Sequence, residues 1–136
     1  MFVDALPDIH HPADIWRLVD AFYARVRGDA LLASFFASRI PDDHWSAHLD
    51  TVARFWTAAL LTQDAGYRAN PGAKHLNLPI EAAHFTRWRA LFGQTVDELF
   101  AGTRAEEIKE RAQKIGDLFQ VKIDQARAGP AGRSTL

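Results

Sequence analysis

The chain has 136 residues, 48% hydrophobic and 24% charged, which suits one compact domain with a real core and is too short for two. Its formal net charge of −1, with both signs scattered, gives no basic surface for nucleic acid, and the absence of cysteine excludes disulfides and thiolate metal sites. No segment approaches the roughly 18 apolar residues of a membrane span, and no leader pattern opens the chain, so we expect a cytoplasmic protein that binds neither membrane nor nucleic acid.

The first half of the chain predicts two long helices separated by a short one. The first spans about residues 13–27, where apolar residues recur at helical spacing until Gly28. A short helix over 31–36 follows, and the second long helix starts near Asp42, which can cap it. The apolar stripe of that helix comprises Trp45, His48, Leu49, Val52, Phe55, Trp56, Ala59 and Leu60. One member, His48, is polar, so an imidazole is expected on a buried face.

The second half predicts two further helices after a long connection. Residues 62–79 lose the helical pattern over a stretch longer than most connections in compact domains, and such loops are often functional. A third long helix is predicted over about 81–100 and a fourth over 104 to about 126. The remaining residues, 128–136, have no apolar periodicity. We therefore expect an all-α domain over 1–127 and a disordered tail over 128–136.

The histidines permit several interpretations when each is taken alone. A histidine on an apolar helix stripe, such as His48, is more often a core residue with an internal hydrogen-bond partner than a ligand. His44 and His48, four residues apart, have a spacing that lets two imidazoles reach one zinc ion, but no third ligand lies on that helix. His75 in the loop and His84 near the start of the next helix are most simply exposed or capping residues.

Considered together, these residues indicate a cofactor. Tyr23 and Trp88 are, singly, core aromatics whose O–H and N–H find internal acceptors. However, one histidine on a buried face, His48, another in a loop, His75, and two aromatic donors on other helices suit a flat apolar cofactor with a single axial position. Haem iron accepts a neutral imidazole as its ligand, and hydrogen-bond donors on the opposite face stabilise bound dioxygen.

The sequence resembles the truncated haemoglobins, and most closely their group III. The resemblance is carried by FYARV, LLASFF, HWSAHLDTVARFW and KHLNLPIEAAHFTRWRALF, in this order and at these spacings. It covers Ile15 to about Ile123, and HLNLP followed by HFTRW is its most specific element. The glycine pairs that mark other truncated haemoglobin groups are not seen at their usual places. The resemblance implies a globin-like, truncated two-over-two helical sandwich.

The resemblance also implies a site built around haem b. His75 matches the proximal iron ligand, and His48 matches a distal histidine that either coordinates the iron as a sixth ligand or gates the pocket. The other residues expected to contact the haem are Tyr23, Phe36, Val52, Leu78 and Trp88.

The function implied by the resemblance is the binding of dioxygen or another small ligand, such as nitric oxide, peroxide or sulfide. A dioxygenase or peroxidase-like activity at the haem would be an extension of ligand binding, and a reductase is the partner expected where such an activity needs one. No catalytic residue of the chain's own is predicted. Two alternatives remain open: a cofactor-free helical interaction module with structural histidines, and a zinc site at His44 and His48.

Overall fold

The computed structural model describes residues 5–37, 39–62 and 81–134. Within these ranges the chain is helical and contains no strand. In chain order the elements are α1 (Pro12–Gly28), α2 (Leu32–Ala37), the 3-10 turn η1 (Asp42–His44), α3 (Trp45–Trp56), the π-helical turn η2 (Thr57–Thr62), α5 (Ala82–Leu99) and α6 (Thr103–Ser134). The predicted helices are therefore present, with boundaries that lie within a few residues of those expected from the sequence, except at the end of α6.

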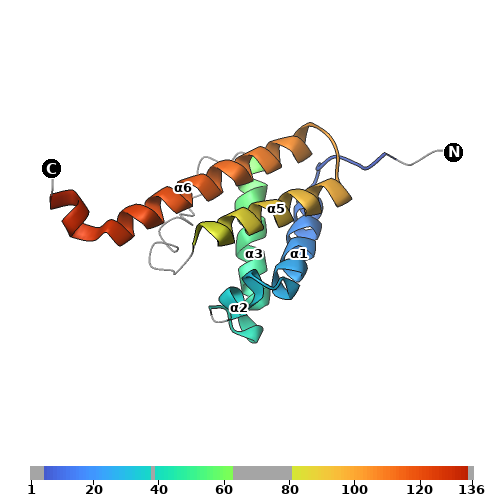
Figure 1. Cartoon of the computed structure of the whole chain (residues 1–136). Coiled ribbons are helices and arrows are strands. Elements are labelled where there is room, and N and C mark those ends of the chain that lie inside the picture. The colour runs from blue at the N-terminus through green and yellow to red at the C-terminus, as the bar shows by residue number, and fades with distance from the viewer. Residues whose placement is uncertain (1–4, 38, 63–80, 135–136) are drawn as a thin grey trace.

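The helices form two antiparallel pairs that cross each other. Helices α1 and α3 pack together as one pair, and α5 and α6 run side by side as the other (Figure 1). Helix α1 also packs against α5, so it connects its own pair to the second one, and it contacts the short helix α2. This two-over-two sandwich buries a core between the pairs, whose largest fully buried side chains include Phe22, Phe92, Phe100, Ile15, Leu18 and Ile108.

Local capping explains where α1, α2 and α5 begin. Pro12 occupies the first turn of α1, where its missing N–H costs nothing, and the Asp14 carboxylate accepts the backbone N–H groups of the two preceding histidines. Asp29 does the same for α2 by accepting the N–H groups of Leu31 and Leu32, at 3.1 Å each. His84 Nδ1 accepts the Glu81 N–H at 3.0 Å and so caps α5.

A buried polar contact fixes α1 against α5. Thr95 is fully buried, and its hydroxyl group donates to the Leu91 carbonyl oxygen at 2.7 Å. The same hydroxyl oxygen accepts a hydrogen bond from Arg25 Nη1 at 2.9 Å, and the Arg25 guanidinium also pairs with Glu98. Arg25 lies two residues after Tyr23, so this contact sets how α1 meets α5 close to Tyr23.

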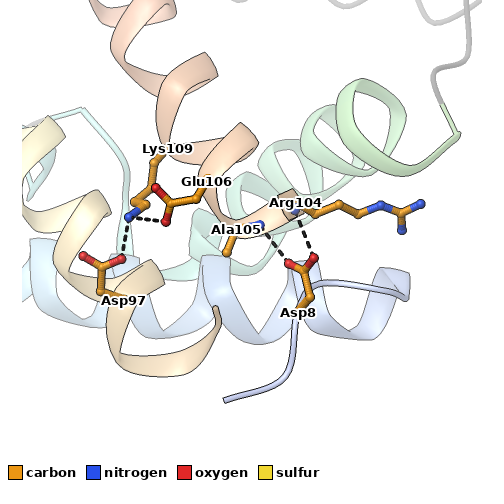
Figure 2. Close-up of polar contacts among 6 residues, drawn as sticks. All are labelled: Asp8, Asp97, Arg104, Ala105, Glu106 and Lys109. Carbon is orange, nitrogen blue, oxygen red and sulfur yellow. Dashed lines mark hydrogen bonds and ion pairs between the residues drawn. The ribbon is translucent and has the colours of Figure 1, made fainter. Parts of the chain in front are cut away.

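The start of α6 is capped from a distant part of the sequence. Asp8 accepts the backbone N–H groups of Arg104 at 3.0 Å and Ala105 at 2.8 Å (Figure 2). Gly102, just before the helix, has φ of +139°, and a Cβ placed on it would lie only 2.5 Å from Asp8 Cγ. Because Gly102 has no side chain with which to cap the helix, Asp8 fills that space and satisfies the exposed donors instead. Ala101 N–H also donates to the Pro7 carbonyl oxygen at 2.9 Å.

Helix α6 extends further than the sequence suggested. Its backbone is helical to Ser134, so the expected end near Ala126 is wrong. The expected end follows the loss of apolar periodicity after residue 126, but an established helix can continue without an apolar stripe, because each residue other than proline that is added gains a backbone hydrogen bond. The domain boundary at residue 127 and the separate tail over 128–136 stay predictions.

Candidate functional site

Three of the predicted site residues meet in one cluster, together with one that was not predicted. This aromatic cluster consists of Tyr23 from α1, Phe36 from α2, and Trp45 and His48 from α3. The Tyr23 ring lies 5.2 Å from the His48 ring and 5.9 Å from the Phe36 ring, between centroids, in edge-to-face geometry. Such geometry is favoured between aromatic rings. The cluster therefore forms where α1, α2 and α3 come together.

Tyr23 remains a hydrogen-bond donor at neutral pH. Its side chain is 6% exposed, and this burial raises its pKa to about 12, because the charged phenolate would lose its hydration. A hydrogen bond with the Trp88 side chain acts in the opposite direction and lowers the pKa, but its effect is smaller. The phenol is thus protonated, and it lies next to the indole of Trp88 as well as the imidazole of His48.

Trp88 is oriented by aromatic neighbours on α1 and α5, and an aromatic ring of α3 supports one of them. Its ring stacks on Phe92 with 5.5 Å between centroids and an interplanar angle of 10°, and it meets the edge of Phe22 at 5.6 Å. Phe92 stacks in turn on Trp56 of α3 at 5.6 Å. The rings of Phe92 and Phe22, with Trp56 behind Phe92, therefore limit the rotation of the Trp88 indole, whose side chain is hydrogen-bonded to Tyr23.

His48 combines a polar group with an apolar setting. The residue is half-buried, and its Nε2 atom is buried, as expected for an imidazole on the inner face of α3. The ring meets Tyr23 and Trp45 edge to face, with 5.6 Å between the His48 and Trp45 centroids. The hydroxyl, imidazole and indole groups of Tyr23, His48 and Trp88 are thus gathered among aromatic rings.

Two residues of the site were missed in the sequence. Trp45 is 6% exposed and contacts the rings of Tyr23, Phe36 and His48, yet it appeared in the sequence only as a member of an apolar stripe. The Arg27 guanidinium carbon lies 4.6 Å from the Trp45 ring centroid. The position of Trp45, one turn before His48, was the available signal, since side chains three residues apart on a helix are neighbours.

Of the remaining predicted site residues, the structure describes Val52 but not His75 or Leu78. Val52 is half-buried and packs against the core, one turn after His48 on α3. His75 and Leu78 lie outside the described residues, so their predicted contacts with haem stay predictions.

The zinc interpretation finds no support among the described residues. His44 is exposed, and no group of three histidine, aspartate or glutamate side chains within the described part of the chain could hold a metal ion. His84 has the capping role that was expected of it, and its ring lies 5.3 Å from that of Phe35.

The chemistry of the gathered groups fits one face of a haem site. Aromatic rings provide an apolar wall for a flat macrocycle, while Tyr23 supplies a neutral O–H donor, Trp88 supplies an N–H group that donates to the Tyr23 hydroxyl oxygen, and His48 supplies a buried nitrogen. Groups of this kind stabilise a small ligand that gains negative charge without adding a charge of their own.

A solved structure has the same arrangement of helices. The crystal structure of a group III truncated haemoglobin from Campylobacter jejuni matches the chain with a TM-score of 0.76 and 29% sequence identity, over 85% of this chain and 92% of that chain. The predicted resemblance to group III truncated haemoglobins is confirmed. With it, the predicted fold class is confirmed as an all-α, globin-like, truncated two-over-two sandwich.

Neither the protein-family models nor the curated proteins contain a match to the chain. In the described part of the chain, no helix is long and apolar enough to cross a membrane.

Proposed function

We propose that the chain binds haem b and uses it to bind dioxygen or another small ligand. The observation that carries this proposal is the meeting of Tyr23, His48 and Trp88 among aromatic rings, inside a truncated globin fold. In the resemblance to group III truncated haemoglobins these are the residues of the distal side. A core that needed only to be filled would not need three polar side chains in one place, because burying polar groups costs free energy.

The residues would contact the two faces of the cofactor separately. His75 would hold the iron from the segment that the sequence predicts to be a loop before α5, while Phe36 and Val52 would contact the macrocycle beside the distal groups. When bound, haem supplies a position at which a small ligand can attach and an iron that can change oxidation state.

Tyr23 and Trp88 would favour ligands that acquire negative charge. The Tyr23 phenol, with a pKa of about 12, donates its proton into a hydrogen bond but does not release it near neutral pH. Dioxygen attracts electron density when it binds and therefore gains from such donors, whereas carbon monoxide stays nearly apolar and gains little. His48, whose ring lies beside that of Tyr23, would obstruct or admit the ligand.

The test is to express the full chain and record its absorption spectra with the iron ferric, ferrous and exposed to carbon monoxide. A Soret band that responds to each change is the expected result, and it should be lost or strongly altered in His75→Gly. His44→Gly is the matched control, because His44 is exposed at the N-cap of α3, where glycine is tolerated.

Removal of haem should also lower the thermal stability. A ligand at 100 times its dissociation constant stabilises the folded state by about 2.7 kcal/mol, so apo and holo protein should differ clearly in Tm. A colourless protein that takes up no added haem would reject the proposal and favour the cofactor-free interaction module. A cytoplasmic location, the identity of the small ligand and a reductase partner are further predictions of the same proposal.

A further inference from the structure

We propose that Trp45, covered by Arg27, is a positioning residue that holds the His48 imidazole against Tyr23 and so restricts access of ligands to the site. The proposal rests on the proposed haem function and assigns roles to two residues that no resemblance indicated. It starts from one observation: Trp45 contacts the rings of Tyr23, Phe36 and His48, which come from three different helices.

The geometry shows how Trp45 can control His48. Side chains on a helix lean toward its N-terminus, so the His48 imidazole leans over the turn that carries Trp45. The two rings are perpendicular, with an interplanar angle of 90° and 5.6 Å between centroids. The Tyr23 ring closes the arrangement, at 5.9 Å from Trp45 and 5.2 Å from His48. Movement of the imidazole away from Tyr23 therefore requires the Trp45 ring to yield.

Arg27 makes that movement more difficult. Its guanidinium carbon lies 4.6 Å from the centroid of the Trp45 ring, which is within the range of a cation–π contact. Arg27 is itself exposed, in the last turn of α1, whereas the ring it covers is 6% exposed. Arg27 thus connects the solvent-facing side of the molecule to the ring that contacts both Tyr23 and His48.

Carbon monoxide is the suitable probe of access, because it gains little from hydrogen bonds and its association rate reports how easily it reaches the iron. The experiment measures this rate by flash photolysis of the full-length, haem-loaded chain. In Trp45→Leu, loss of the edge-to-face contact should speed association about threefold to tenfold. Trp45→Phe keeps an aromatic ring and should restore most of the parent rate.

The arginine variants test the same assignment without opening a core cavity. Arg27→Gln should speed association by about twofold to fivefold through loss of the cation–π contact, and Arg27→Lys should change it less. Arg17→Gln is the matched control: Arg17 is another exposed arginine of α1, and its guanidinium carbon lies 5.5 Å from the centroid of a different aromatic ring, that of Phe100. Its carbon monoxide association rate should equal that of the parent.

A second measurement reports the ring arrangement rather than ligand binding. In the carbonmonoxy protein, the NMR signals of the Tyr23 ring, assigned with Tyr23→Phe, should shift in Arg27→Gln and stay in place in Arg17→Gln. If both Trp45→Leu and Arg27→Gln retain haem and show the parent association rate, the role assigned to Trp45 and Arg27 is overturned. The proposed haem function would then still stand. A chain that takes up no haem would overturn the proposed function and this assignment together. If Trp45→Leu does not fold, Arg27→Gln decides the question.

Discussion

The aromatic cluster and the start of α6 show two opposite uses of polar groups. In the cluster, Tyr23 and His48 are held mainly by ring contacts, with centroids 5–6 Å apart. At the start of α6, by contrast, Asp8 is bound directly by backbone N–H groups, at 2.8–3.0 Å (Figure 2). Ring contacts position a side chain without using its O–H or N–H group. Capping, in contrast, pairs the backbone N–H groups of the helix with an acceptor.

This difference separates function from stability within one small fold. A change at the start of α6 should alter the free energy of unfolding and leave ligand kinetics unaffected, because its hydrogen bonds end on backbone groups. Removal of the Tyr23 hydroxyl should act mainly on ligand kinetics, since the ring contacts of Tyr23 remain, and its effect on the free energy of unfolding should be limited to the lost hydrogen bond with Trp88. The predictions below test this separation.

The largest expected effect is at Gly102. The substitution Gly102→Ala would place a Cβ 2.5 Å from Asp8 Cγ, on a residue whose φ of +139° is rarely adopted by residues other than glycine. Backbone strain and a displaced cap should together reduce the free energy of unfolding by about 2–4 kcal/mol. Chemical denaturation followed by circular dichroism measures the change.

The control for this prediction is the same substitution at Gly93. A Cβ there meets nothing within 4 Å, and Gly93 lies within α5, so Gly93→Ala should stabilise the protein by up to about 1 kcal/mol. Carbon monoxide and dioxygen dissociation rates should match the parent in both variants. A clear change of those rates in Gly102→Ala would show that the start of α6 also acts on the site.

The next largest effect should come from the two donors of the site. Tyr23→Phe and Trp88→Phe each remove a donor and keep most of the aromatic shape. A hydrogen bond to a charged group contributes roughly 1.5–3 kcal/mol, so dioxygen dissociation should accelerate by about one to two orders of magnitude in each. Stopped-flow displacement of dioxygen by carbon monoxide measures this rate.

Carbon monoxide serves as the internal control, since its dissociation should change little in either variant. Trp16→Phe is the matched substitution, because Trp16 is 38% exposed on α1 and lies away from the cluster. Unchanged dioxygen dissociation in Tyr23→Phe, Trp88→Phe and the double variant would mean that both are ordinary core aromatics.

The helices could be predicted from the sequence because their apolar residues follow one period and their ends carry strong local signals. Pro12 marks the start of α1, and the stripe that contains His48 correctly placed an imidazole on the inner face of α3. The end of α6 was predicted wrongly, because the loss of apolar periodicity after residue 126 does not end a helix that has already formed.

The candidate site could be predicted only in part, for a physical reason. Resemblance supplied Tyr23, His48 and Trp88, whose polar atoms make them recognisable against an apolar stripe. Trp45 and Arg27 could not be found in this way, because their role depends on the packing of α1 against α3, which no local pattern encodes. The capping of α6 by Asp8 was missed similarly, since the two partners are 96 residues apart.

Asp8 provides the smallest predicted effect and one that depends on pH. Burial raises the pKa of Asp8, but backbone hydrogen bonds from Arg104, Ile9 and Ala105, with the charge of His10, outweigh this and lower the pKa overall. A lowered folded pKa means that the carboxylate stabilises the fold above the ordinary value of 3.8, and that this contribution is lost as the pH falls through the lower folded value.

Asp8→Ala should therefore destabilise the protein by about 1 kcal/mol at pH 7, the usual cost of losing a helix cap. The difference in free energy of unfolding between parent and variant should shrink as the pH falls below 3.8, because the parent then loses the charge that the variant already lacks. Asp20→Ala, at an exposed position of α1, is the control and should change the free energy of unfolding at pH 7 by no more than about 0.5 kcal/mol. A pH-independent difference for Asp8→Ala would show that the carboxyl group acts through its shape alone, and the contrast between a charged cap and a ring-packed site would then have to be abandoned.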